Sequence, residues 1–142
     1  MEDSFNLQRF VVAQEGEIDV VLAELRGGRK CGHWMWFIFP QMKGLGSSGT
    51  ANYYAISCRA EAEAYLSHPV LGLRLVDCTE LVNLVESRSA VDIFGYPDWL
   101  KFRSSMTLFA VLNPATNPFS KALDKYFGGE TDRRTLSLLE SA

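Results

Sequence analysis

The sequence has no long hydrophobic run, no N-terminal hydrophobic block and no excess of basic residues. Its longest uncharged apolar segment, Trp34–Met42, is less than half of the roughly 20 residues that a membrane-spanning helix needs. Residues 1–15 include charges and no sustained apolar block, so we expect no secretory signal peptide and a cytoplasmic location. The net charge of −3, with scattered lysines and arginines, gives no general attraction for nucleic acid.

Paired cysteines and metal-binding spacings are also missing. Cys31, Cys58 and Cys78 are odd in number and far apart, so we expect reduced thiols and no metal site. The GxSxG, HExxH and P-loop patterns do not occur. No motif therefore supports assigning the chain to the classical nucleophilic hydrolases, proteases, kinases or metalloenzymes. The sequence predicts no cofactor.

The sequence is rich in apolar residues at helical spacing. A chain of 142 residues with 47% hydrophobic residues has the size and composition of one globular domain, residues 1–142. Glycine pairs follow two of the periodic segments, as is common at helix C-termini. The pattern predicts an all-α or nearly all-α single compact domain of six or seven helices, at residues 7–14, 18–25, 59–66, 69–85, 97–109 and 119–127 and around Leu136 and Leu139.

The segment His33–Phe39 has no clear secondary structure in the sequence. It is apolar on both faces of a strand and also all round a helix, so periodicity leaves both conformations open. Its residues Trp34 and Trp36 are candidates for an aromatic wall that stacks on a nucleobase, or are simply core residues. His33 is a candidate acid–base group because imidazole titrates near neutral pH, although a packed or capping histidine is the alternative.

A glycine-rich loop, Lys43–Thr50, follows, and we expect residues 53–56 to be briefly extended. The loop contains the pattern GxGxxG, but the helical surroundings lack the βαβ unit in which that pattern binds a dinucleotide. Small residues such as Gly46 and Ser47 would still let a ligand's phosphates approach backbone amides near Lys43. An ordinary mobile loop is the alternative.

The predicted helix after Pro97 presents a carboxylate, an ammonium and a hydroxyl at helical spacing. Asp98, Lys101 and Ser105 adjoin the apolar face of that helix, where they could line a site for a sugar or phosphate. The alternative is an ordinary surface ion pair between Asp98 and Lys101, with Asp98 favourable in the first turn.

Four blocks of the sequence resemble a small bacterial family of unknown function, some of whose members are automatically labelled "calpastatin". The family implies a mainly α-helical fold and no established activity, and this aromatic-rich chain is unlike the long, disordered calpain inhibitors of that name. More remotely, the family is similar to the NADAR superfamily, which implies NAD or ADP-ribose chemistry by analogy of fold. The blocks are Leu7–Phe10 with Ala13-Gln14, HWMWFIFPQ from His33, residues 62–75, and Asp98 and Lys101 followed by SSMTLF from Ser104.

These observations lead to one functional hypothesis and one main alternative. The hypothesis is an enzyme that hydrolyses an N-glycosidic bond in an ADP-ribose-like or nucleotide-like substrate, a reaction that needs a positioned carboxylate. The alternative is a non-catalytic module that binds a nucleotide or a protein; an accessory protein that depends on a neighbouring gene product is a third reading. Under the hypothesis Asp98, Lys101 and His33 are catalytic, and the ligand-binding residues are Trp34, Trp36, Lys43, Gly46, Ser47 and Ser105.

Overall fold

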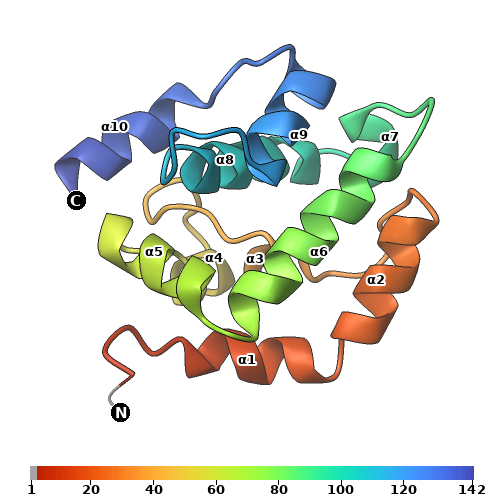
Figure 1. The fold of residues 1–142 in the computed structure, drawn as a ribbon. Coiled ribbons are helices and arrows are strands. Elements are labelled where there is room, and N and C mark those ends of the chain that lie inside the picture. The colour runs from red at the N-terminus through yellow and green to blue at the C-terminus, as the bar shows by residue number, and fades with distance from the viewer. Residues whose placement is uncertain (1–2) are drawn as a thin grey trace.

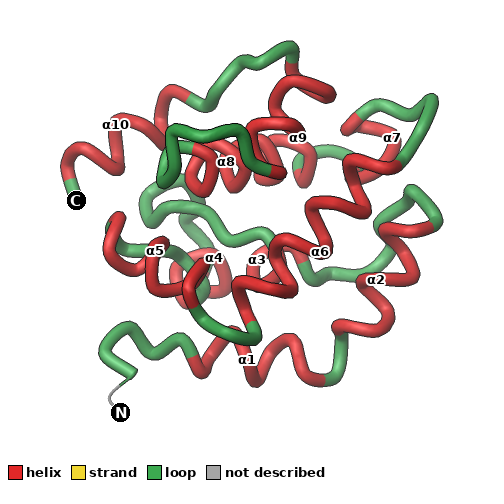
Figure 2. Tube along the Cα trace, in the orientation of Figure 1, coloured by secondary structure: helices red, strands yellow, loops and turns green. Residues whose placement is uncertain are grey.

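The computed structural model describes residues 3–142 and folds them into ten helices with no strand. The all-α prediction is therefore confirmed, but the predicted number of six or seven helices is too low (Figures 1 and 2). The helices are α1 (Gln8–Glu15), α2 (Ile18–Arg26), α3 (Met35–Ile38), α4 (Gly49–Tyr53), α5 (Arg59–Ser67), α6 (Leu71–Leu84), α7 (Ala90–Phe94), α8 (Asp98–Ala110), α9 (Pro118–Phe127) and α10 (Arg133–Ser141).

The sequence left the segment His33–Phe39 open between helix and strand, and the structure forms the short helix α3 within it. The sequence did not predict α4 or α7, and each of these three helices is only about one turn long. Such short helices show no apolar periodicity, and local caps hold two of them. The Ser48 hydroxyl accepts the Ala51 amide at 3.1 Å and begins α4, where the sequence predicted a loop. Ser89 and Asp92 form a reciprocal capping box that begins α7. Only Ile56 of the segment expected to be extended pairs in β fashion, in a single parallel bridge with Met42.

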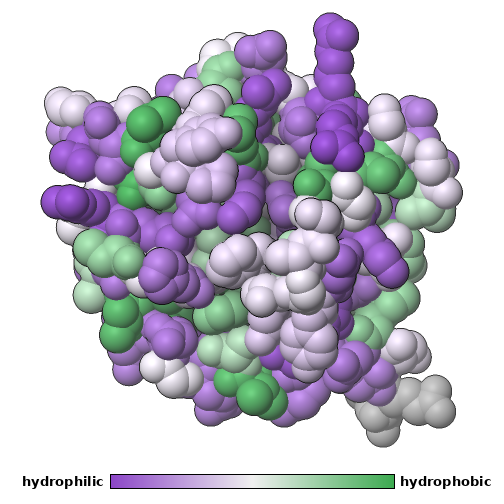
Figure 3. All heavy atoms as spheres, turned by 180° about the vertical axis from the view of Figure 1, so that it is seen from behind, coloured by the Kyte–Doolittle hydropathy of each residue, from purple (hydrophilic) through white to green (hydrophobic). Residues whose placement is uncertain are grey.

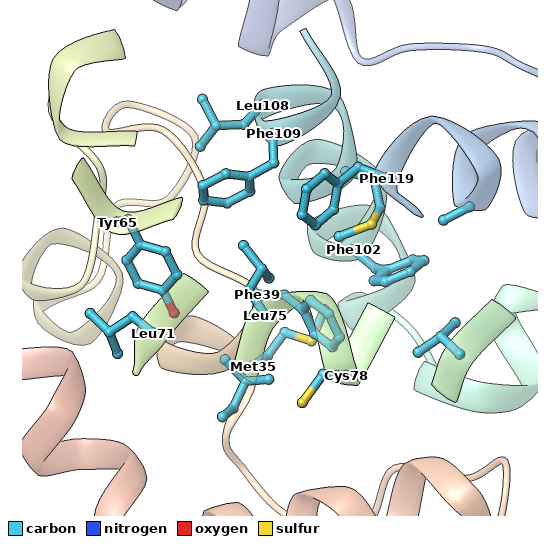
Figure 4. Close-up of a cluster of buried hydrophobic side chains, with 14 of the residues drawn as sticks. Met35, Phe39, Tyr65, Leu71, Leu75, Cys78, Phe102, Leu108, Phe109 and Phe119 are labelled. Carbon is cyan, nitrogen blue, oxygen red and sulfur yellow. The ribbon is translucent and has the colours of Figure 1, made fainter. Parts of the chain in front are cut away.

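Helix α6 is the central helix of the domain and crosses the face of the molecule in Figure 1. It packs against α2, α3, α5 and α9, which surround it. The spacing of apolar residues in the sequence predicts a buried stripe on this helix at Leu71, Leu75, Cys78, Val82 and Val85. The first four are buried as predicted, whereas Val85 lies just after the end of α6 and is partly buried. Figure 4 shows how the stripe meets side chains from α3, α5, α8 and α9 in one continuous core.

Helix α8 carries the other half of the core. The ring of Phe102 packs edge-on against Phe39, with centroids 5.1 Å apart, and stacks on Phe94 at 4.4 Å. From Ser104 to Phe109 every side chain of α8 is buried, so this half of the helix is enclosed on all sides. The start of α8 lies nearer the surface, where its polar side chains are accessible to a ligand.

Arg9 joins α1 to the segment that follows α4. Its guanidinium donates to the carbonyls of Phe5, Asn6, Tyr53 and Ala55 at 2.6–2.9 Å and forms an ion pair with Glu61 at 2.7 Å. The Arg9 and Glu61 side chains are 8% and 3% exposed. Because Tyr53 ends α4 and Ala55 follows it, two of these hydrogen bonds tie the end of α4 to α1.

The large hydrophobic side chains that the surface exposes are spread over several helices. Within residues 3–142 no helix is long and apolar enough to cross a membrane. The large exposed hydrophobic side chains come from different helices, among them Val12, Val20, Leu84 and Val91. Figure 3 shows that, on the face it presents, hydrophobic residues are scattered among hydrophilic ones.

Candidate functional site

A surface cavity of about 480 Å³ lies where four separate parts of the chain meet. Trp36 and Gln41 come from α3 and the segment after it, and the glycine-rich loop contributes residues 45–48. The first turns of α8 and the start of α10 supply the remaining walls. The side chains that carry charge or hydrogen-bonding groups are those of Trp36, Gln41, Ser47, Ser48, Lys101, Arg103, Ser104, Asp132 and Arg134.

Lys101 and Trp36 lie together on one wall. The Lys101 ammonium is 4.5 Å from the centroid of the Trp36 ring, a favourable cation–π distance. The same ammonium is 3.1 Å from the Asp98 carboxylate, which also pairs with Lys30 at 2.7 Å. Asp98 therefore lies behind Lys101 and orients it, while Asp98 itself does not line the cavity.

The two lysines determine the ionisation of Asp98. Partial burial raises the pKa of Asp98, but the hydrogen bonds and positive charges of Lys30 and Lys101 outweigh this effect and hold that pKa below its ordinary value. Asp98 is thus a carboxylate at neutral pH. It is suited to electrostatic stabilisation and unsuited to donating a proton as a general acid.

The lining of the cavity also contains two arginines, Arg103 of α8 and Arg134 of α10, that form none of the ion pairs in residues 3–142. Arg103 donates to the Thr131 carbonyl at 2.7 Å, and its buried Nε has no hydrogen-bond partner among the described residues. Arg134 donates to the Gly44 carbonyl at 3.0 Å. Asp132, which lies between them in the lining, has one carboxylate oxygen that accepts from Ser104 and Thr135. The cavity thus contains guanidinium charge that no carboxylate of residues 3–142 neutralises by an ion pair.

Two glycines of the glycine-rich loop are required by close packing against neighbouring helices. A Cβ on Gly46 would lie 2.6 Å from the Ala51 Cβ, so only glycine lets the loop lie this close to α4. Gly44 has a φ of +104°, and a Cβ there would meet Leu138 of α10 at 3.2 Å. Because no strand precedes this loop in the described chain, the GxGxxG pattern is not a Rossmann dinucleotide site.

Comparisons with known proteins agree with this fold. Residues 4–139 match the model of the family described as "Protein of unknown function (DUF1810)". The chain belongs to the DUF1810 family. It is also similar to the conserved hypothetical protein Rv1873 from Mycobacterium tuberculosis, for which there is a crystal structure. The two sequences are 56% identical, and the match covers 97% of this chain and 99% of that chain with a TM-score of 0.95. No curated protein matches the sequence. These comparisons confirm the expected family of unknown function and assign no activity to it.

In this DUF1810 protein the cavity includes four of the residues proposed from sequence: Trp36, Lys101, Gly46 and Ser47. Asp98 joins them indirectly, through Lys101. His33 and Lys43 are exposed elsewhere on the surface and do not line this cavity. The cavity therefore contains fewer than half of the nine site residues proposed from sequence.

Trp34 and Ser105 lie in the interior instead of at the cavity. Trp34 is fully buried, and its indole N–H donates to Glu24 at 2.9 Å. Two residues further along a helix, the chain has rotated by about 200° about the helix axis, so the side chains point in nearly opposite directions. Trp34 and Trp36 therefore do not face the same cavity. Ser105 is also fully buried, with no partner for its hydroxyl among the described residues, and its neighbour Ser104 faces the cavity instead.

Sequence reasoning missed Arg103, Asp132 and Arg134. A signal for one of them, Arg134, exists in the sequence, because Arg133 and Arg134 occupy the first turn of α10. Cations are disfavoured near a helix N-terminus, so a basic pair at that position points to a role other than helix stability. No group of three or more histidine, cysteine, aspartate or glutamate side chains in residues 3–142 is arranged to hold a metal ion.

Proposed function

We propose that the cavity binds a small anionic ligand with an aromatic part, of the nucleotide type. The observation that carries this proposal is that Arg103 and Arg134, which form no ion pair with a carboxylate in the described chain, line the same cavity as Trp36 and Lys101. Arginine forks match the geometry of phosphate oxygens, and an indole edge or face packs well on a nucleobase.

Charge and size support the same ligand class. The chain as a whole carries a net charge of −3, yet the lining of the cavity has three cationic side chains against one carboxylate. This local reversal of charge attracts anions. A volume of about 480 Å³ lies within the range of ordinary small-molecule sites. A nucleotide ligand is also in keeping with the remote resemblance to the NADAR superfamily.

Hydrolysis of an N-glycosidic bond in this ligand is a second candidate function. Such a reaction needs a carboxylate near the sugar, to stabilise positive charge as the bond breaks. Asp98 is ionised but lies behind Lys101, whereas Asp132 lines the cavity. The hydrolytic proposal therefore depends on Asp132, with Asp98 as a residue that positions Lys101.

Ligand-dependent thermal unfolding tests the binding proposal. We expect AMP or ADP to raise the melting temperature, because a ligand present at 100 times its dissociation constant stabilises the native state by about 2.7 kcal/mol. Arg134→Ala should abolish this shift, because it removes one of the two guanidinium groups proposed to bind the anion. The fold should survive this substitution, since Arg134 is exposed and the one hydrogen bond described for its side chain is to Gly44. Arg26→Ala, at an exposed arginine of α2, is the matched control and should keep it. Failure of adenosine, AMP and ADP alike to shift the melting temperature would overturn the proposal.

Incubation with NAD, ADP-ribose and ADP-ribosylated nucleosides, followed by chromatography of the products, separates an enzyme from a binding module. Turnover that disappears in Asp132→Asn, while ligand-dependent melting persists, would support hydrolysis. Ligand-dependent shifts of the melting temperature, with no product in any incubation, would support the binding proposal and overturn the hydrolytic one.

A further inference from the structure

A second hollow of about 490 Å³ adjoins the cavity at its α10 side. It is lined by Arg103 and by residues 129–134, the connection from α9 to α10 and the first turn of α10. Arg103, Asp132 and Arg134 line both spaces. The cavity and this hollow are therefore neighbours that share those three side chains.

The second hollow adds one cationic side chain, Arg133, and one carboxylate, Glu130, to the charges that line the cavity. Together the two spaces are lined by four cationic side chains, those of Lys101, Arg103, Arg133 and Arg134, against Glu130 and Asp132. None of the three arginines forms an ion pair with a carboxylate of residues 3–142, and Asp132 is engaged by Ser104 and Thr135. This unneutralised charge extends beyond the cavity that holds Trp36.

The geometry of α10 separates its two arginines. Successive residues of an α-helix point about 100° apart, and Arg134 lines both spaces whereas Arg133 lines only the second. Two guanidinium forks that diverge in this way fit two neighbouring anionic groups better than they fit one.

We propose that the ligand carries a chain of at least two phosphates, which runs from the cavity past Arg103 and Arg134 into the second hollow, where Arg133 contacts the terminal phosphate. This inference rests on the proposed function and narrows the ligand from nucleotides in general to nucleoside diphosphates and their esters. Arg133 is thereby a residue that selects for the length of the phosphate chain.

Calorimetric titration with AMP, ADP, phosphate and pyrophosphate at one ionic strength tests the inference. We expect ADP to bind about tenfold more tightly than AMP, as one additional charge-assisted contact of about 1.4 kcal/mol would give. Arg133→Glu should remove this advantage and leave the affinity for AMP within about twofold. The fold should survive, because Arg133 is exposed and an acidic residue is favourable in a first helical turn.

Arg26→Glu changes the net charge of the protein by the same amount at a distant exposed arginine, and should alter neither affinity. Equal affinities of AMP and ADP for the unmodified protein, or an equal loss of both in Arg133→Glu, would overturn the inference while leaving the nucleotide site in place. Binding of pyrophosphate that depends on Arg133, without binding of any nucleotide, would support the phosphate-chain site and overturn the nucleotide proposal. No binding of any of the four compounds would overturn both.

Discussion

The ion pair of Arg9 with Glu61 offers a sharp test of how the cavity is supported. Replacing Arg9 by alanine leaves the 3%-exposed Glu61 carboxylate without its counter-charge and leaves the carbonyls of Tyr53 and Ala55 without their donor. Breaking a buried ion pair by removing one partner costs about 3–5 kcal/mol. We therefore expect Arg9→Ala to reduce the free energy of unfolding by about 4 kcal/mol, a large part of the stability of an ordinary domain.

Urea denaturation followed by circular dichroism measures this loss, and Arg59→Ala is its matched control. Arg59 pairs with Glu63 at 4.0 Å on the surface of α5, with both side chains more than half exposed, so its removal should cost no more than about 0.5 kcal/mol. Equal effects of the two substitutions, or a cost below about 1 kcal/mol for Arg9→Ala, would refute the role given to the buried pair.

Three further predictions follow from single residues. Gly72→Ala should lower the free energy of unfolding by about 3 kcal/mol in urea, because a Cβ at Gly72 would lie 2.0 Å from the Leu66 carbonyl. Burial raises the pKa of Cys78 to about 12, so Ellman's reagent should label the exposed Cys31 in the native protein and Cys78 only after unfolding. The pKa of Asp98 in the folded protein lies below its ordinary value of 3.8, so its ionised form stabilises the fold at pH values above 3.8, and this contribution is lost as the pH falls from 3.8 through the lower folded-state pKa. Asp98→Asn should therefore cost most at neutral pH, and a cost that does not decline as the pH is lowered below 3.8 would contradict this.

Most of the longer helices were predictable from the sequence because their buried faces repeat locally. The stripe Leu71, Leu75, Cys78 and Val82 defines α6 without knowledge of any partner, and it is buried as predicted. The capping residues Ser48 and Ser89 also begin helices from local chemistry, although α4 and α7 are too short to show periodicity. The missed helices thus had local signals weaker than a repeated apolar face.

The candidate site was only partly predictable, because its members meet through contacts between distant segments. Trp36 and Lys101 were found from their chemistry. The sequence did not reveal that Arg134 would complete the same cavity, since α10 reaches it by packing on α8 and against the glycine-rich loop. Nor did composition show that Trp34 would be in the core while Trp36 faces the cavity.

The sequence by itself determined the helical class, the faces of the long helices and the family, because each of these depends on residues close together in the chain or on a nearly complete match of pattern. Only the tertiary structure decided which side chains form the cavity, since the direction of a side chain depends on the rotation and packing of its whole helix. It is also the tertiary structure that makes Asp98 a partner of two lysines, and Arg103 and Arg134 a pair of cationic groups beside Trp36.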